Sequence, residues 1–265
     1  MLALTRKNKI KELILEQKNV TVSELASFFS VTEETIRRDL KSLEESGLLI
    51  RTYGGAYIQE GVVNDIRDSL RETILVPNKQ RIARQCAQFI NNGDTITLDA
   101  STTAFHICSE IKNKRITVLT DSLKVANYLS NFNNIHLIST GGAFSDKYAS
   151  FIGKSAQKTI REYFVDKVFM SCRSVDMKHG ITDANEDIAA IRTIMAERAT
   201  KVFLIADHSK FDKISFVSVC GFDKISAVVV DEPLGAEWRQ FLEQQNVSLY
   251  ECTEDNTEIP AFVSE

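Results

Sequence analysis

The strongest constraint on the fold is an alternation of strand-like and helix-like segments that begins near residue 78. The strand-like segments are short and rich in Val, Ile, Leu and Thr, and helical stretches such as KQRIARQCAQFI and EDIAAIRTIMAER separate them. In chain order they are DTITLDA, RITVLTD, NIHLIST, VDKVFMSC, TKVFLIAD, SAVVVDE and VSLYEC. Strands that alternate with helices usually pair in parallel, because each helix carries the chain back across a face of the sheet. The pattern therefore predicts an α/β domain with a mostly parallel sheet.

The first 58 residues have a different organisation, with three short helix-like stretches followed by a hairpin. Thr21 and Glu24 form a capping-box pattern at the start of the second stretch, and Thr32 is a good N-cap for the third. Gly54-Gly55 marks the turn of the hairpin in LLIRTYGGAY. Three helices with a tight turn between the second and third, then a hairpin, predict a winged helix-turn-helix. In that fold the third helix enters the major groove of DNA.

The third helix has one apolar and one charged side. Ile36, Leu40 and Leu43 recur at helical spacing and predict the buried side, whereas Arg38 and Lys41 point the other way. Arginine forks and short hydroxyl side chains suit guanine edges and phosphates. The residues that we assign to DNA binding are Thr32, Thr35, Arg37, Arg38, Lys41 and Arg51. The alternative is a solvated helix face whose basic residues pair with nearby glutamates.

Asp39 lies at the edge of the apolar side of the same helix. A carboxylate in that place is expected to bind a nearby arginine or backbone group, and this structural role is favoured over DNA contact.

Composition restricts the class of protein but does not identify a nucleic-acid binder. The formal net charge is −4, and the first 57 residues carry +1 while the remainder carries −5. The 43% hydrophobic content is that of an ordinary globular protein. No stretch is apolar enough for a signal peptide or a membrane span, so we expect a cytoplasmic protein without a membrane partner.

The five cysteines are scattered without a C-x-x-C pair and are expected to be reduced, buried thiols. His106 and Cys108 are the closest approach to metal-ligand spacing, and on a helix they point apart. We therefore expect neither a metal nor a cofactor.

Three loops at predicted strand ends carry residues suited to a ligand. In open α/β sheets the ligand lies beyond the carboxyl ends of the strands. Hydroxyls at a helix start hold anions, paired glycines allow close approach, and a carboxylate three residues from an ammonium suits a sugar hydroxyl and a phosphate. The candidate residues are Asp99, Ser101, Thr102, Thr103, Gly141, Gly142, Asp207 and Lys210. Taken singly, each loop is also explained as an ordinary cap or turn.

Several of these motifs together resemble the DeoR family of bacterial transcriptional regulators. The resemblance rests on RKNKIKELI, TEETIRRDL and the Gly-Gly turn in the first domain, and on LDASTT, TDS, STGG, SFIG, HGITDANED and ADHSKF in the second. It implies an effector domain related to ribose-5-phosphate isomerase that binds a phosphorylated sugar in a pocket containing the eight residues named above. Ser174 departs from the pattern, because the family commonly has glycine there.

The resulting hypothesis is a regulator, expected to be a repressor, of a carbohydrate-catabolism operon, and not an enzyme. Its partners would be double-stranded operator DNA, a phosphorylated sugar effector and further copies of itself as a dimer or tetramer, because one winged helix reads only a few base pairs. We expect a DNA-binding domain at 1–58, a linker at 59–77, the effector domain at 78–252 and an acidic tail at 253–265. Two alternatives stay open: a sugar-phosphate isomerase with Asp99 and Asp207 as acid and base, and a DNA-binding oligomer without a small ligand.

Overall fold

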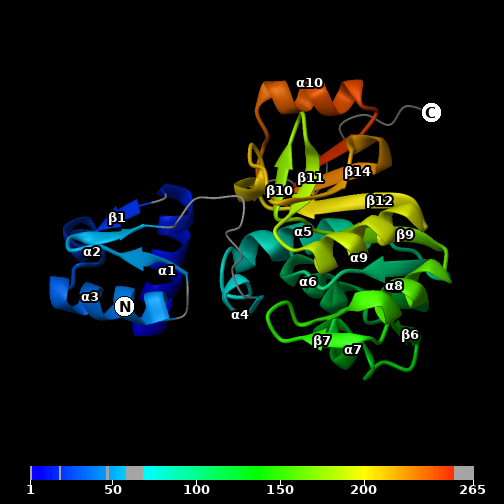
Figure 1. Cartoon of the computed structure of the whole chain (residues 1–265), viewed down its shortest axis with the longest axis horizontal. Coiled ribbons are helices and arrows are strands. Elements are labelled where there is room, and N and C mark those ends of the chain that lie inside the picture. Colours follow the sequence, from blue (N-terminus) through cyan, green and yellow to red (C-terminus); the bar gives the residue numbers. More distant parts are fainter. Residues whose placement is uncertain (1, 18, 46–47, 58–67, 254–265) are drawn as a thin grey trace. The chain divides into compact units, whose positions relative to one another are not determined.

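The computed structural model describes residues 2–17, 19–45, 48–57 and 68–253 (Figure 1). The first half of the predicted linker and nearly all of the predicted tail lie outside these residues. The chain divides into two compact units, Met1–Val76 and Pro77–Glu265.

The first unit contains four helices and a small antiparallel sheet among its described residues. The strand order in the sheet is β1-β3-β2. The elements are α1 (Ala3–Gln17), β1 (Asn19–Thr21), α2 (Val22–Phe29), α3 (Glu33–Glu45), β2 (Ile50–Arg51), β3 (Gly55–Tyr57) and α4 (Asp68–Arg71). The predicted helix-turn-helix and wing are confirmed. Strand β1 was not predicted, because three residues are too short to show an alternating pattern.

Local signals in the sequence account for this first unit. The capping box is present, since the Glu24 N–H donates to Thr21 Oγ1 at 3.2 Å and the Thr21 N–H donates to Glu24 Oε2 at 3.2 Å. Ser30 ends α2 with a left-handed φ of 53°. A Cβ on Gly55 would lie 2.1 Å from the Val20 carbonyl oxygen, so glycine there lets β3 pair with β1.

The end of the predicted linker differs from expectation. The side chain of Ile74 is buried in the apolar core of the first unit, and Leu75 packs against that core. Lys11 Nζ donates to Thr73 Oγ1 at 2.8 Å. The segment that follows α4 therefore packs as part of the first unit, and the polar composition of the stretch concealed its two apolar anchors.

The second unit is built on a seven-stranded parallel sheet with the order β15-β14-β12-β9-β4-β5-β6. Its strands are β4 (Thr95–Leu98), β5 (Ile116–Thr120), β6 (Ile135–Ser139), β9 (Val165–Met170), β12 (Ala199–Ala206), β14 (Ala227–Val230) and β15 (Ser248–Glu251). Two antiparallel additions were not predicted: the hairpin of β7 (Ala143–Ser145) and β8 (Ser150–Ile152), and the sheet of β10 (Ser174–Asp176), β11 (Gly180–Asp183) and β13 (Val217–Cys220).

Helices cover both faces of the parallel sheet (Figure 1). On one face pack α5 (Val76–Gln88), α6 (Thr102–Ile111) and α7 (Leu123–Leu129). On the other pack α8 (Gly153–Arg161), α9 (Glu186–Glu197) and α10 (Ala236–Gln244). Val168 and Met170 face one apolar layer while Phe169 faces the other, as alternation along a strand requires. All loops that leave the carboxyl ends of the parallel strands therefore meet at one edge.

The start of α5 differs slightly from expectation. The helix begins at Val76, so that Pro77 lies in its first turn and does not precede it. Proline is accepted there because the first N–H groups of a helix have no partner within the helix.

Candidate nucleic-acid interface and ligand site

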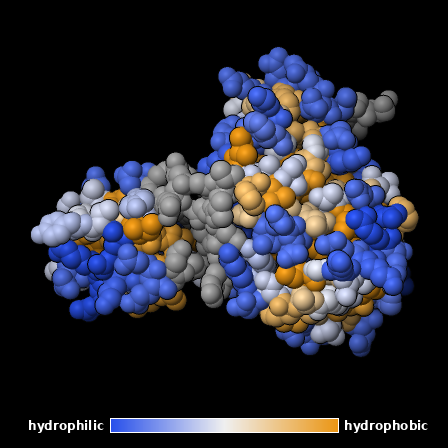
Figure 2. Space-filling view, viewed as in Figure 1, coloured by the Kyte–Doolittle hydropathy of each residue, from blue (hydrophilic) through white to orange (hydrophobic). Residues whose placement is uncertain are grey.

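The predicted DNA-binding residues lie directly before α3, on α3 and on β2, and most of their side chains are exposed. Figure 2 shows hydrophilic residues gathered over α3. Thr32 caps the helix, since its Oγ1 accepts from the Thr35 N–H at 3.3 Å. Arg37 pairs with Glu33 at 2.8 Å. Arg38 and Lys41 are exposed, and no ion pair joins them to any residue that the structure describes. These two cations are therefore the most available to a phosphate or a base.

A buried ion pair fixes α3 against α1. Arg6 Nε lies 2.6 Å from Asp39 Oδ2, and both side chains are less than 10% exposed. Lys7 Nζ donates to Ser42 Oγ at 2.9 Å. The prediction that Asp39 has a structural partner is confirmed, and α1 sets the orientation of the helix that presents Arg38.

Glu44 connects the wing to the same helix. Its Oε1 accepts from the backbone N–H of Arg51 at 2.9 Å, and its Oε2 lies 3.4 Å from Arg51 Nε. The Thr52 N–H donates to the Gly55 carbonyl at 2.9 Å and closes the turn of the wing. Sequence reasoning missed Glu44 because its partner is seven residues away in another element.

Four parallel strands are each followed by a buried aspartate. Asp99, Asp121, Asp207 and Asp231 follow β4, β5, β12 and β14 and are at most 4% exposed. The pairing of Leu98 with Thr120 and of Ala206 with Val230 places these carboxylates as two adjacent pairs along the edge. The repeated strand-then-aspartate pattern is visible in the sequence, although only two of the four were predicted as site residues.

Asp99 is engaged by protein groups on both oxygens. Its Oδ1 accepts from the Ser101 N–H at 3.1 Å, and its Oδ2 accepts from the Ser171 N–H at 2.9 Å and from Arg192 Nε at 2.9 Å. Arg192, on α9, also binds Asp183. Burial lowers the pKa of the Arg192 guanidinium, but the carboxylates of Asp99 and Asp183 outweigh burial and raise this pKa above its ordinary value. In this structure Asp99 therefore organises the strand ends, and Arg192 is a functional candidate that sequence reasoning missed.

The start of α6 offers an anion-binding geometry. Ser101 caps the helix by accepting from the Ala104 N–H at 3.0 Å, and Thr102 and Thr103 are buried in the first turn. First-turn N–H groups carry the positive end of the helix dipole. The three predicted hydroxyl residues are thus brought to one point at the edge of the sheet.

The loop after β12 carries the predicted carboxylate and ammonium. Asp207 Oδ1 accepts from the Ser209 N–H at 3.1 Å, and Lys210 Nζ lies 3.9 Å from Asp207 Oδ2. Burial raises the pKa of Asp207, but Lys210, the Ser209 hydrogen bond and Lys79 together outweigh burial and lower it. Asp207 is therefore ionised and lies beside two ammonium groups.

The two predicted glycines have different roles. Gly142 has φ +113°, and a Cβ there would lie 2.7 Å from the Ile152 carbonyl oxygen, so it serves close packing against β8. Gly141 has φ +59° with open space where a Cβ would be. Of the pair, only Gly141 leaves room for an external group.

Asp121 is the second candidate that sequence reasoning missed. Its Oδ2 accepts from Ser150 Oγ at 2.7 Å, while its buried Oδ1 has no hydrogen-bond partner among the residues that the structure describes. Burial, and then the charge of Asp99, raise the pKa of Asp121 to about 7, and Ser150 and Arg192 only partly oppose this rise. The carboxyl therefore changes charge near neutral pH.

The α6 start and the loop after β12 are separated by one strand, β9, in the sheet order. Two strand spacings give a separation of about 10 Å between Asp99 and Asp207, since neighbouring strands lie about 4.8 Å apart. Burial raises the pKa of Cys172, which follows β9, to about 12, so a neutral thiol lies between the two charged groups. The two predicted groups of site residues therefore lie at the same edge of the sheet, on either side of β9.

Ser174, the departure from the family pattern, lies in β10. Its Oγ is 2.9 Å from Ser215 Oγ, and its side chain is buried. This serine is thus used to join β10 to the segment before β13.

Among the described residues, one group meets the geometric requirement for a metal ion: His208, Asp231 and Glu232, with ligand atoms within 4.8 Å of one another. Both Asp231 oxygens already accept hydrogen bonds, from the His208 N–H at 2.7 Å and from Asn78 Nδ2 at 2.5 Å. Hydrogen bonds among His208, Asp231 and Asn78 therefore explain why these side chains lie close together.

A groove lined by Gly93, Arg115, Asn134 and His136 lies at the amino ends of β5 and β6, opposite the candidate loops. No described helix combines the length and the apolar character that a membrane crossing requires.

A winged helix-turn-helix followed by an α/β domain with polar strand-end loops defines a DNA-binding transcriptional regulator with a separate sensor domain. Residues 6–61 match the model of the DeoR-like helix-turn-helix domain. Residues 76–232 match that of the DeoR C terminal sensor domain. The chain therefore belongs to the DeoR family of transcriptional regulators.

Curated relatives match over nearly the whole chain. The uncharacterized HTH-type transcriptional regulator YulB of Bacillus subtilis (strain 168) is 39% identical, over 94% of this chain and 96% of that protein. The L-fucose operon activator of Haemophilus influenzae (strain ATCC 51907 / DSM 11121 / KW20 / Rd) is 31% identical, over 91% and 97%. The glycerol-3-phosphate regulon repressor of Escherichia coli (strain K12) is 29% identical, over 93% and 98%. These relatives are transcriptional regulators, in agreement with the fold.

Solved structures resemble the chain only distantly. Ribose 5-phosphate isomerase A of Methanocaldococcus jannaschii is 16% identical with a TM-score of 0.39, over 52% of this chain and 55% of that one. At this level the likeness carries no conclusion about activity.

Proposed function

We propose that the protein is a repressor of a carbohydrate-catabolism operon whose affinity for operator DNA is controlled by a phosphorylated sugar. The observation that carries this proposal is the shared strand-end edge, with the α6 start at one point and the Asp207–Lys210 loop about 10 Å away, two strand spacings along the sheet. That separation suits a phosphate at one group and sugar hydroxyls at the other. Two of the relatives described above are named for an L-fucose operon and a glycerol-3-phosphate regulon.

On the DNA side we propose that Arg38 and Lys41 make the main contacts, with Thr35 and Arg37 beside them. The Thr32 hydroxyl is used as a helix cap and Arg51 is held by Glu44, which supports a backbone-positioning role for both. A homo-oligomer would present two or more such helices to repeated half-sites.

A thermal-shift screen tests the effector part. The ligands are inorganic phosphate, glycerol 3-phosphate, ribose 5-phosphate, fructose 6-phosphate and fuculose 1-phosphate, each sugar beside its unphosphorylated form. A ligand at about 100 times its Kd adds about 2.7 kcal/mol to the free energy of unfolding. We expect one phosphorylated compound to stabilise the protein, and its unphosphorylated form to fail. No stabilisation by any phosphate compound would contradict the proposal.

Two lysine variants test the location of the site. We expect Lys210→Ala to abolish the stabilisation and to leave operator binding intact. Lys224→Ala is the matched control, because this exposed lysine pairs with Asp223 away from the strand-end loops. A normal response in Lys210→Ala would refute the assigned pocket.

The sign of regulation is measured by gel shift with duplexes selected from a random library by the wild-type protein. Release of the selected duplex by the stabilising compound supports a repressor, and tighter binding would overturn that assignment in favour of an activator. Conversion of the compound to an isomer by the purified protein would instead support an enzyme.

A further inference from the structure

One buried carboxylate joins the candidate ligand loop to the first turn of α5. Asp231 is 0% exposed. Its Oδ1 accepts from the His208 N–H at 2.7 Å, and its Oδ2 accepts from Asn78 Nδ2 at 2.5 Å and lies 2.9 Å from His208 Nδ1. His208 directly follows Asp207 in the loop, and Asn78 is the third residue of α5. The loop and the helix start therefore share one hydrogen-bond acceptor.

Lys79 makes a second connection between the same two elements. It is 4% exposed in α5, and its charge is one of those that lower the pKa of Asp207. An anion bound beside Lys210 would act on Lys79 through the same low-dielectric surroundings. A change of charge in the loop therefore changes the electrostatic energy of Lys79 in α5.

The connection is important because α5 begins where the DNA-binding unit ends. The helix begins at Val76, which is also the last residue of the first compact unit. Asn78 thus lies two residues beyond the junction with the DNA-binding unit. We propose that Asn78 is a positioning residue that couples anion binding in the 207–210 loop to the junction between the two units. This inference rests on the proposed effector site.

The physical reason is that Asp231 cannot lose one partner without cost. A buried carboxylate oxygen left without a donor has lost its hydration, and no hydrogen bond compensates that loss. If an anion draws His208 and Lys210 toward itself, Asp231 must follow the loop or remain with Asn78. Either response changes how firmly the first turn of α5 is held, and a ligand that prefers one arrangement shifts the population toward it.

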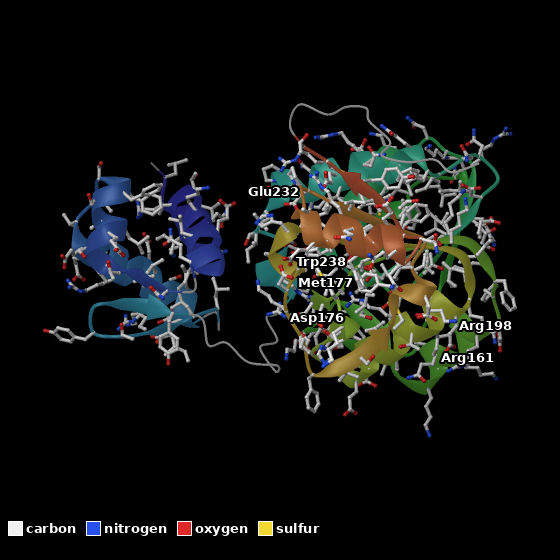
Figure 3. All side chains as sticks on the ribbon, turned by 90° about the horizontal axis from the view of Figure 1, so that it is seen from above. Arg161, Asp176, Met177, Arg198, Glu232 and Trp238 are labelled. Atoms are coloured by element: carbon white, nitrogen blue, oxygen red, sulfur yellow. The ribbon has the colours of Figure 1, made fainter. Side chains whose placement is uncertain are left out.

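The chain contains one tryptophan, and it reports on this loop. Trp238, labelled in Figure 3, donates from Nε1 to Asp212 Oδ1 at 2.8 Å, and its ring meets that of Phe211 at 5.1 Å. Its fluorescence therefore measures anion binding at the loop, while hydrogen exchange measures the stability of α5 separately.

The experiment compares the wild-type protein, Asn78→Ala and Asn134→Ala with inorganic phosphate as the probe. Asn134 is the matched control, because its Nδ2 also makes two structural hydrogen bonds, to the carbonyls of Lys112 and Lys114, at the opposite edge of the sheet. At phosphate concentrations about ten times the Kd, protected amides should exchange about tenfold more slowly. We expect this slowing in both the 207–213 loop and the start of α5 for the wild type and Asn134→Ala.

For Asn78→Ala we expect an unchanged Trp238 titration and slowing in the loop, but none at the start of α5. Slowing at both places in Asn78→Ala would overturn the inference, as would a wild-type protein in which α5 does not respond. Loss of the Trp238 titration in Asn78→Ala would also overturn it, because the residue would then belong to the binding site. Absence of any response to phosphate in the wild-type loop would count against the proposed effector site itself, and the inference would fall with it.

Discussion

Replacing Asp121 by asparagine tests whether this buried carboxyl binds a proton in the native protein near neutral pH. The native carboxyl has a pKa of about 7, raised from its ordinary value of 3.8 by burial and then by Asp99. Asparagine has nearly the same shape, its Oδ1 can accept the hydrogen bond from Ser150 Oγ, and it does not titrate. The substitution therefore removes a proton-binding group while preserving the packing.

The size of the effect follows from the difference between the two pKa values. Between 3.8 and about 7 the native state holds one proton that the unfolded state has released. The free energy of unfolding of the wild type therefore falls as the pH rises through this window, by about 1.4 kcal/mol per pH unit for one proton. From about pH 5 to about pH 8 the loss amounts to about 2.5 kcal/mol relative to Asp121→Asn, and above about pH 8 the difference becomes constant.

The assay is denaturant unfolding of both proteins at several pH values, followed by Trp238 fluorescence. This tryptophan lies in the second unit, so the transition reports on the unit that contains Asp121. The expected result is a difference in stability that changes with pH in favour of Asp121→Asn. Parallel stability profiles across the range would refute the reasoning, because they would mean that the native carboxyl is already ionised at low pH.

Three further predictions concern the other parts of the chain. Arg38→Ala should weaken binding to the selected duplex about 5- to 150-fold in a gel shift, the loss of about 1–3 kcal/mol for one base-edge contact, and an unchanged affinity would remove Arg38 from the interface. Asp39→Leu should destabilise the first unit by about 3–5 kcal/mol in thermal unfolding because it leaves Arg6 buried and unpaired, whereas the double variant with Arg6→Met should recover most of the loss. Cys172 should resist alkylation at neutral pH in the native protein and react after unfolding, as measured by mass spectrometry, because burial keeps its thiol protonated.

Much of the first unit could be predicted because its determinants are local. The capping box of Thr21 and Glu24 spans three residues, and the apolar spacing of Ile36 and Leu40 assigns the buried side of α3 directly. Even the role of Asp39 followed from its place on that side. The role of Glu44, which binds the wing, could not be predicted, because no local pattern in the sequence indicates its partner in another element.

The sequence predicted which loops meet at the carboxyl ends of the strands, but not the hydrogen bonds and ion pairs that join them. Strand and helix alternation fixed which loops meet, and the hydroxyls at the α6 start were found because an N-cap is a local pattern. Arg192 was missed because it contacts Asp99 across 93 residues and lies in an otherwise ordinary helix. Asp121 was missed although it ends a strand-like segment, because that pattern does not distinguish a buried aspartate from an exposed one. Both depend on tertiary burial, which periodicity does not report.

The attachment of the wing to α3 through Glu44 restricts how regulation can work. Since the Glu44 carboxylate binds both the backbone N–H and the side chain of Arg51, the position of the wing is coupled to that of α3. The bases preferred within a single half-site would then be the same in the presence and absence of an effector. Under the proposed regulation, an effector would alter the distance and rotation tolerated between half-sites. Its effect would then depend on the spacing of the half-sites in the operator and not on their base sequence.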